Sequence, residues 1–407
     1  MLNLHMSPSA KIRLLATTAL GLVVTLAAPP TARANPTGGT VVGGSATITA
    51  APGTTTINQT SNRAVINWEG FSIDSGETTT FVQPNANAVA LNRVTGSEAS
   101  MINGTLTANG NVFLINQNGV MIGAGAKVNV GGLVATTTDI DDKKFLDGIY
   151  HFDRPTGNPD AKVINNGLIT AADQGLAVLV GPTVENNHVI NAKLGTVALG
   201  SAETFTVDLA GDGLISFDTG QPVNRTPGNP QVSNSGTIDA AGGTVILSAG
   251  QAASVVDKAI DMSGVITAQS VGLEGGTIVL SGGEGTTVVS GTLDASGAAA
   301  GTKGGTIEVT GATVALTSSA KVDASGSAGG GKVRIGGDKK GGGTTPHAQV
   351  ASVAQGATIN VSARDKGDGG SIIVWSDRST VFDGLATARG GSAGATAALS
   401  KPRPLAR

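Results

Sequence analysis

The chain has 407 residues, 61 of them glycine, with 3% aromatic residues and no cysteine. A compact core of this size normally uses more aromatic side chains, so burial must come from many small aliphatic residues, as in a long repetitive stack. The formal net charge is −3 and no basic stripe is present, which argues against nucleic acid as a partner.

The N-terminus has the features of a secretory signal. Two basic residues precede an apolar run from Leu14 to Ala28, and Ala32 and Ala34 form an A-x-A cleavage site. A transmembrane anchor is the alternative, but a span needs about 20 apolar residues and this run is shorter. We therefore predict that residues 1–34 are a signal peptide, cleaved after Ala34.

A strand–turn–strand pattern follows the signal. It is present in residues 103–119, NGTLTANGNVFLINQNG, and in residues 165–181, NNGLITAADQGLAVLVG. The charged stretch 139–160 interrupts it and predicts an excursion from the stack, with a short helix and a loop. A Pro-rich loop is expected at 220–230. We interpret both interruptions as solvated connections.

Three carboxylates in the first interruption leave one enzymatic alternative open. Asp139, Asp141 and Asp142 could supply the acid pair of a β-helix that cleaves polysaccharides. Lys143 and Lys144 follow directly and would pair with them at the surface. We therefore expect no catalytic residues, and we expect neither a metal site nor a cofactor.

The pattern becomes regular in the C-terminal half. Five copies of a short strand, a Gly/Ser/Asp turn, Gly-Gly and a second strand occupy residues 234–250, 263–283, 290–311, 319–337 and 355–377. The residues that follow Gly-Gly are Thr244, Thr277, Thr306, Lys332 and Ser371, at steps of 33, 29, 26 and 39. The strands are thus constant and the turns vary in length.

Within these strands polar and apolar residues alternate, as in Thr-Ile-Glu-Val from Thr306, which indicates one wet and one dry face. One unit cannot bury its dry face, but stacked units can. We predict an all-β right-handed parallel β-helix with N-terminal capping strands and extra-helical hairpins or loops. Glycines at the corners are expected to supply positive φ angles.

The last repeat is incomplete. Residues 382–394 begin a new turn without a second strand, and residues 395–407 have no β pattern. An open end exposes apolar side chains and strand edges. We therefore expect an irregular tail, either of a truncated member of a longer class or of a chain closed by a partner.

Residues 35–140 resemble the haemagglutination-activity, or two-partner secretion, domain of the filamentous haemagglutinin family. Within that family the high-molecular-weight adhesins are the most similar subgroup. The resemblance is carried by TGGTVVGGSATI at 37–48, SNRAVINWEGFSI at 61–73, FVQPNANAVALNRVTG at 81–96 and NVFLINQNGVMIGAGAKVNVGGLVATT at 111–137.

Two family motifs map onto this chain. Asn116, Gln117, Asn118, Gly119 and Val120 stand where the family usually has Asn-Pro-Asn-Gly followed by Ile or Val. The departure is Gln for Pro, which removes a fixed φ and leaves the turn less rigid.

The second motif is a weaker match. Pro84 and Asn85 resemble the family's Asn-Pro-Asn-Leu, but Gln83 and Ala86 differ from it. Both motifs could be structural turns, contacts for a transporter, or both.

The resemblance implies a division of the chain. A secretion domain would cover residues 35–233, with its core motifs in 35–140, and β-helical Gly-rich repeats would cover 234–394. The secretion domain would be recognised in the periplasm by the periplasmic domains of an outer-membrane barrel transporter.

The resemblance also implies a location and a role. The chain would fold at the surface of a Gram-negative bacterium or be secreted from it, and would serve adhesion or haemagglutination through a host or neighbouring-cell receptor or glycan. The alternative by the same route is the stalk of a contact-dependent toxin.

Overall fold

The computed structural model describes residues 35–209, 215–217, 223–226, 230–250, 258–272 and 275–393. The signal peptide with its cleavage residues, the tail at 395–407 and most of the Pro-rich loop at 220–230 lie outside the described residues. The part of the chain from Ala34 onward forms one unit.

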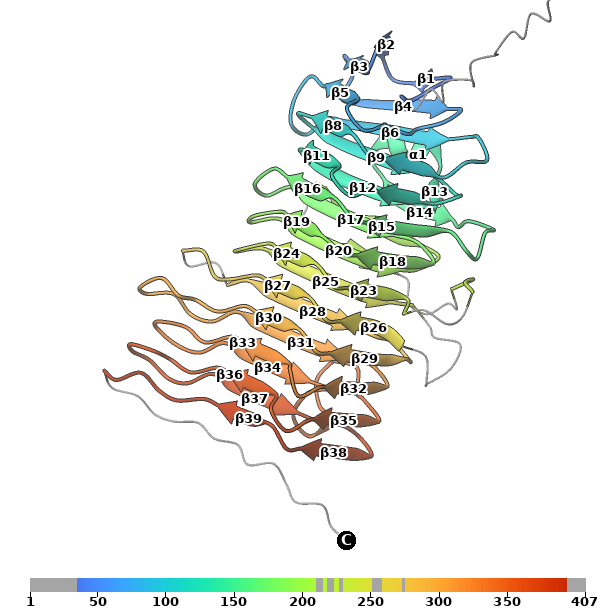
Figure 1. Cartoon of the computed structure of the whole chain (residues 1–407). Helices are drawn as coiled ribbons and strands as arrows, with labels where there is room; N and C mark the ends of the chain where they lie inside the picture. Colours follow the sequence, from blue (N-terminus) through green and yellow to red (C-terminus); the bar gives the residue numbers. More distant parts are fainter. Residues whose placement is uncertain are drawn as a thin grey trace, which may run out of the picture. The chain divides into compact units, whose positions relative to one another are not determined.

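Three long sheets wrap around a common axis and form a right-handed parallel β-helix (Figure 1). The prediction of fold class is confirmed. A coil passes through the second face, then the third, then the first, and the next coil repeats this order below it.

The first face contains β1 (Thr40–Gly43), β4 (Arg63–Trp68), β6 (Val89–Val94), β9 (Asn111–Ile115), β12 (Gly132–Thr136), β17 (Leu176–Val180), β20 (Thr196–Ser201), β25 (Thr244–Ala249), β28 (Thr277–Ser281), β31 (Thr306–Thr310), β34 (Lys332–Ile335) and β37 (Ser371–Val374).

The second face contains β7 (Ser100–Ile102), β10 (Val120–Ile122), β15 (Lys162–Asn165), β18 (Thr183–Asn186), β23 (Val232–Asn234), β26 (Lys258–Met262), β29 (Thr286–Val289), β32 (Thr313–Leu316), β35 (Val350–Val353) and β38 (Ser379–Phe382).

The third face contains β2 (Ala46–Ala51), β3 (Thr54–Gln59), β5 (Thr78–Val82), β8 (Thr105–Ala108), β11 (Lys127–Val130), β16 (Leu168–Ala171), β19 (Val189–Asn191), β24 (Thr237–Asp239), β27 (Val265–Thr267), β30 (Thr292–Asp294), β33 (Lys321–Asp323), β36 (Thr358–Asn360) and β39 (Leu385–Thr387).

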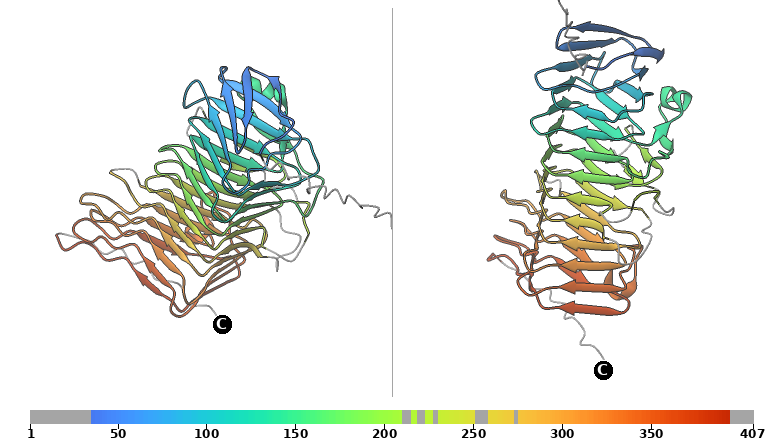
Figure 2. Two further views of the ribbon diagram at one scale, coloured as in Figure 1. Left: turned by 45° about the horizontal axis from the view of Figure 1, so that its top comes forward. Right: turned by 45° about the vertical axis from the view of Figure 1, so that its right-hand side comes forward.

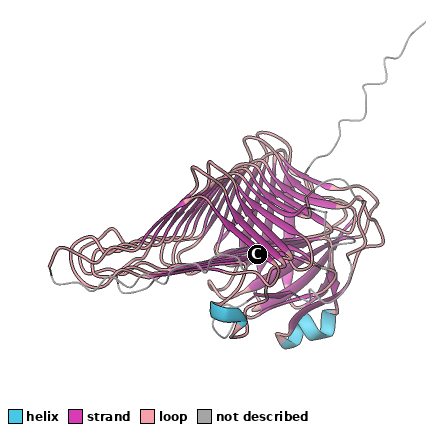
Figure 3. Cartoon of the chain, turned by 90° about the horizontal axis from the view of Figure 1, so that it is seen from below, coloured by secondary structure: helices cyan, strands magenta, loops and turns pink. Residues whose placement is uncertain are grey.

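The repeat register predicted from Gly-Gly is confirmed. Thr244, Thr277, Thr306, Lys332 and Ser371 are paired in turn along the first face. Turns of different length therefore leave the strands aligned, because the extra residues project from the stack, as Figure 3 shows in the view along it.

The core is a continuous column of inward side chains. In β31 Ile307 and Val309 are fully buried, whereas Glu308 between them points outward. The N-terminal end of the column is closed as predicted: β1 pairs antiparallel with β4, and β2 with β3, above the buried Trp68 and Phe71.

Corner glycines such as Gly125, Gly283 and Gly356 have positive φ angles, as predicted, but the Gly-Gly pairs have a different role. Only Gly242 among their first glycines has a positive φ, and the second glycines have none. A Cβ on Gly305 would instead overlap the carbonyl oxygen of Gly276, and one on Gly331 would overlap that of Gly305. These glycines are needed because successive backbones approach closely, not because of backbone conformation.

A segment outside the stack forms a second layer on the first face. β13 (Asp139–Ile140), β14 (Tyr150–Arg154), β21 (Phe205–Val207) and β22 (Ile215–Phe217) make an antiparallel sheet, and α1 (Asp142–Asp147) follows β13. Figure 2 shows α1 projecting beside the stack. Among the described residues, no helix is long and apolar enough to span a membrane.

The excursion at 139–160 is confirmed, but its interpretation as a solvated connection was wrong. Phe145 and Phe152 are fully buried. The ring of Phe113 on β9 lies 6.1 Å from that of Phe145 and 5.4 Å from that of Tyr150. The aromatic residues, rare in the sequence, are concentrated where the excursion packs on the stack.

A buried asparagine ladder ends three successive strands of the second face. Asn165 Nδ2 donates to Asn186 Oδ1 at 2.7 Å, and Asn186 Nδ2 donates to Asn234 Oδ1 at 2.6 Å. All three side chains are inaccessible to solvent. Each amide therefore satisfies the next rung.

Asn186→Ala is expected to lower the free energy of unfolding by about 2–4 kcal/mol, because it leaves one buried donor and one buried acceptor unpaired. Urea unfolding followed by circular dichroism measures the change. The neighbouring Asn187→Ala is the control: its exposed side chain bonds Asn166 and Ser235 at the surface, where water can replace it, so its effect should stay within about 0.5 kcal/mol. Equal effects of the two substitutions would contradict the role of the ladder.

Candidate functional site

The motif at 116–120 forms a tight turn from β9 on the first face to β10 on the second. The backbone N–H of Gly119 donates to the Asn116 carbonyl at 2.9 Å, which closes a four-residue turn. Asn116 is fully buried. Its Oδ1 accepts from the Asn118 N–H at 2.9 Å, and its Nδ2 donates to the Glu98 carbonyl and to Ser100 Oγ.

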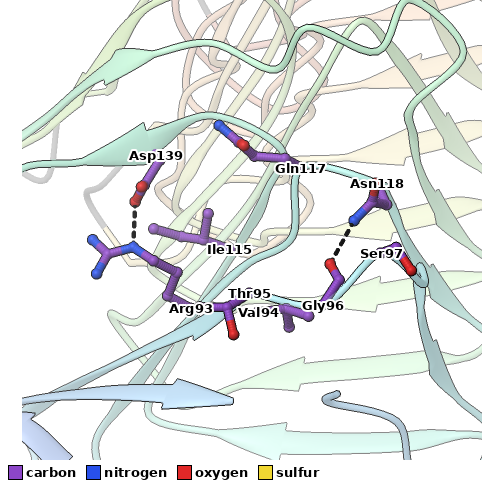
Figure 4. Close-up of a pocket in the computed structure, with 9 residues that line it drawn as sticks. All are labelled: Arg93, Val94, Thr95, Gly96, Ser97, Ile115, Gln117, Asn118 and Asp139. Atoms are coloured by element: carbon purple, nitrogen blue, oxygen red, sulfur yellow. Dashed lines mark hydrogen bonds and ion pairs between the residues drawn. The ribbon is translucent and has the colours of Figure 1, made fainter. Parts of the chain in front are cut away.

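The other motif residues divide into anchors and an exposed tip. Asn118 Nδ2 donates to the Gly96 carbonyl at 3.0 Å (Figure 4), and Val120 is buried in the core. Gly119 has φ +115°, and a Cβ there would press on the backbone of Lys162. The Gln117 side chain is exposed, and only its carbonyl is held, by Thr156 Oγ1 at 2.7 Å.

Pro84 and Asn85 form an exposed turn from the third face to the first. Asn85 Oδ1 accepts from the Asn87 N–H at 2.9 Å, and Asn85 Nδ2 donates to Asn62 Oδ1 at 2.9 Å. The anchor of this turn is the preceding Gln83, which is 5% exposed.

Sequence reasoning treated Gln83 only as a departure from the motif. Its Nε2 lies within hydrogen-bonding distance of Gln59 Oε1 and of the Ala88 and Asn111 carbonyls. Its Oε1 accepts from the Gly110 N–H at 3.0 Å. A glutamine at the end of an alternating strand gave no signal of this buried role.

The structure does not bring the two motifs together. The side-chain amide of Asn111, at the start of β9, donates to the carbonyl of Ala86, which follows the turn at 84–85. Asn116 follows the other end of β9. The turns therefore lie at opposite edges of the first face, about 17 Å apart along one strand. A partner that contacts both must span the face.

A surface pocket of about 490 Å³ adjoins the 116–120 turn. Figure 4 shows Gln117 and Asn118 on one side, Thr95 to Ser97 on another, and Arg93 facing Asp139. Polar residues line most of it, with Val94 and Ile115 as the apolar exceptions. The pocket thus joins one predicted motif to the base of the excursion.

Arg93 holds the excursion to the stack. Its Nε donates to Asp139 Oδ1 at 2.8 Å, its Nη2 lies 2.6 Å from Asp142 Oδ1, and Nη2 also donates to the Ile140 carbonyl. Burial opposes the positive charge of the guanidinium, but the bonds to Asp142 and Asp139 outweigh it and raise the pKa of Arg93. The sequence gave no indication of this long-range contact.

The carboxylates considered for catalysis are paired with arginines, not with the lysines predicted. Asp139 and Asp142 bind Arg93, and Asp141 Oδ2 lies 2.7 Å from Arg154 Nη2. Asp141 also caps α1: the Lys144 backbone N–H, then Arg154, outweigh desolvation and lower the pKa of Asp141. Each of the three carboxylates is thus held by an arginine, and the arrangement offers no acid pair to a substrate.

Comparisons with known proteins agree with this geometry. The family model of the TPS secretion domain matches residues 32–295. The HMW1 secretion domain from Haemophilus influenzae has a crystal structure with a TM-score of 0.75 at 34% identity, covering 88% of this chain and 92% of that one.

Two curated relatives also match. A heme/hemopexin-binding protein of Haemophilus influenzae strain Rd is 40% identical over 198 residues, which are 46% of this chain and 21% of that protein. A second heme/hemopexin-binding protein of Haemophilus influenzae is 48% identical over 113 residues, 28% of this chain and 12% of that protein. The matches therefore span about a fifth or less of these relatives.

The parallel β-helix described above is thus the fold of a secretion domain. This chain belongs to the two-partner secretion (TPS) domain family. The resemblance predicted from residues 35–140 is confirmed, and the coarse class that follows is a secreted exoprotein.

Gln117→Pro is expected to raise the free energy of unfolding by about 0.5–1 kcal/mol, because proline restricts the unfolded chain. Gln117 has no positive φ, and its backbone N–H donates to no group in the described part of the chain. Urea unfolding measures the change against Gln117→Ala, which should stay near the parent. If the proline variant were less stable than the parent, the backbone at Gln117 would not have the proline-compatible conformation described here.

Proposed function

We propose that this chain is the exoprotein of a two-partner pair, and that periplasmic domains of an outer-membrane barrel transporter bind the turns at 116–120 and 84–85. The observation that carries the proposal is the construction of the turn at 116–120. Asn116 and Val120 are buried anchors, and Gln117 is presented to solvent on a tip that makes no side-chain bond to the described residues.

The rest of the chain suits passage through a narrow pore. It has no cysteine, so no disulfide can lock it before export. Its fold is built mainly from neighbouring coils, each of which can add to the previous one. Folding outside the membrane, coil by coil, would hinder return and give export a direction without ATP.

Adhesion at the cell surface is the role we propose for the exported β-helix, because residues 35–140 resemble the high-molecular-weight adhesins. A second candidate is capture of heme or hemopexin, because both curated relatives are named as heme/hemopexin-binding proteins. Titration of the purified chain with heme separates the two: a saturable shift of the heme absorbance favours capture, and binding to host cells without that shift favours adhesion.

Gln117→Glu tests the recognition step. The two side chains have almost the same shape, so folding should not change, but a carboxylate buried against the transporter would be costly. In cells that express the chain with its transporter, we expect the exported fraction to fall at least about tenfold. Immunoblots of medium and periplasm measure it.

Asn187→Asp is the matched control, since it also turns an exposed corner amide into a carboxylate, but outside both motifs. It should be exported like the parent. Normal export of Gln117→Glu would argue against recognition at this turn, and export without the transporter would refute the two-partner route itself.

A further inference from the structure

A column of apolar side chains lies uncovered on the second face. Met101 on β7, Met121 on β10 and Ile164 on β15 are paired in register, one above the other. Met101 is 38% exposed, and the other two are half-buried. Their neighbours Val120 and Ile122 point inward and are buried, so β10 is apolar on both faces.

The column is confined to three rungs. The next outward residue is Glu185, which lies 3.5 Å from Lys162 and forms a polar border. Ser233 and Asp261 follow it in register. These polar residues lie on β18, β23 and β26 in Figure 1, and apolar outward residues return only further down the stack, at Val288 and Val381.

The fold treats the first face differently. There the outward side chains of the same coils, Phe113 and Val178 among them, are buried under the aromatic residues of the excursion. Met101 and Met121, by contrast, remain partly exposed. An uncovered apolar patch with a polar border is typical of a protein–protein contact, and methionine adapts to irregular partners.

The position of the column indicates the partner. Met121 follows the proposed recognition turn by one residue, and the Ser100 N–H beside Met101 donates to the Gly119 carbonyl of that turn at 3.0 Å. One bound protein can therefore contact Gln117 and the column together. At the polar border, the charges of Lys162 and Glu185 cancel because the two side chains are paired. The border therefore has no net charge that would attract a lipid headgroup.

We propose that Met101, Met121 and Ile164 form the apolar half of the surface that the transporter's periplasmic domains bind, next to the polar turn at 116–120. This inference rests on the proposed function and extends it. The turn gives polar specificity, and the column supplies apolar area, because polar contacts exchanged with water add little net affinity.

The test is the double variant Met101→Thr with Met121→Thr, in the full chain expressed with its transporter. Threonine keeps the strand propensity and removes the apolar surface. Loss of two methionine contacts should lower the exported fraction, and the affinity for detergent-solubilised transporter, about tenfold or more. The urea midpoint of the purified variant should stay at the parent value.

Two controls separate docking from folding. Val288→Thr changes an outward residue of the same face far from the turn and should be exported normally. Met101→Leu with Met121→Leu keeps the apolar surface and should also be exported normally. Failure of the leucine pair, or a lower urea midpoint in the threonine pair, would overturn the inference, because folding would then explain the loss.

The outcome is distinguishable from failure of the proposed function. If Gln117→Glu blocks export and the threonine pair does not, the column has no part in recognition and the turn stands. If neither blocks it and export needs no transporter, the proposed function fails. The chain's binding to protein-free lipid vesicles is measured as well. If the threonine pair loses that binding as strongly as it loses binding to the transporter, the column contacts the membrane and the inference is overturned.

Discussion

Hydrogen bonds between parallel strands in register hold every other part of this molecule in place. Because the side-chain period of a strand is two, a shift by one residue would exchange the buried Ile307 with the outward Glu308 and repeat the error in adjoining coils. Close approach of the second glycines and the ladder through Asn186 both depend on the same alignment.

The excursion adds contacts that a simple stack lacks. Arg63 on β4 donates to the Tyr150 hydroxyl and to the Leu146 carbonyl, and Arg93 on β6 binds Asp139 and Asp142. The coils that contain β4 and β6 are thus tied to the antiparallel sheet of the excursion. The other two strands of that sheet, β21 and β22, lie much later in the chain. The N-terminal region is therefore joined over long sequence distances, whereas the later repeats contact chiefly their neighbours.

Sequence patterns predicted what is local or periodic. Gly-Gly spacing placed Thr277 opposite Thr306, and alternation identified the buried residues. Contacts between residues tens of positions apart could not be predicted from such patterns. Examples are Arg93 with Asp139, Phe113 with Phe145, and the buried Gln83 with Gln59. The 116–120 turn was found through a resemblance, whereas the uncovered Met121 became apparent only once register showed which side of β10 faces outward.

In-register stacking can be tested directly because the chain has no cysteine of its own. Thr277→Cys with Thr306→Cys places two outward cysteines on adjacent strands, with Cα atoms about 4.8 Å apart, a separation that a disulfide can bridge. Thr277→Cys with Lys332→Cys places them two strands apart, beyond that reach. Mass spectrometry after mild oxidation of the folded protein should find the disulfide in the first variant alone. A disulfide in the second, or in neither, would contradict the stacked register.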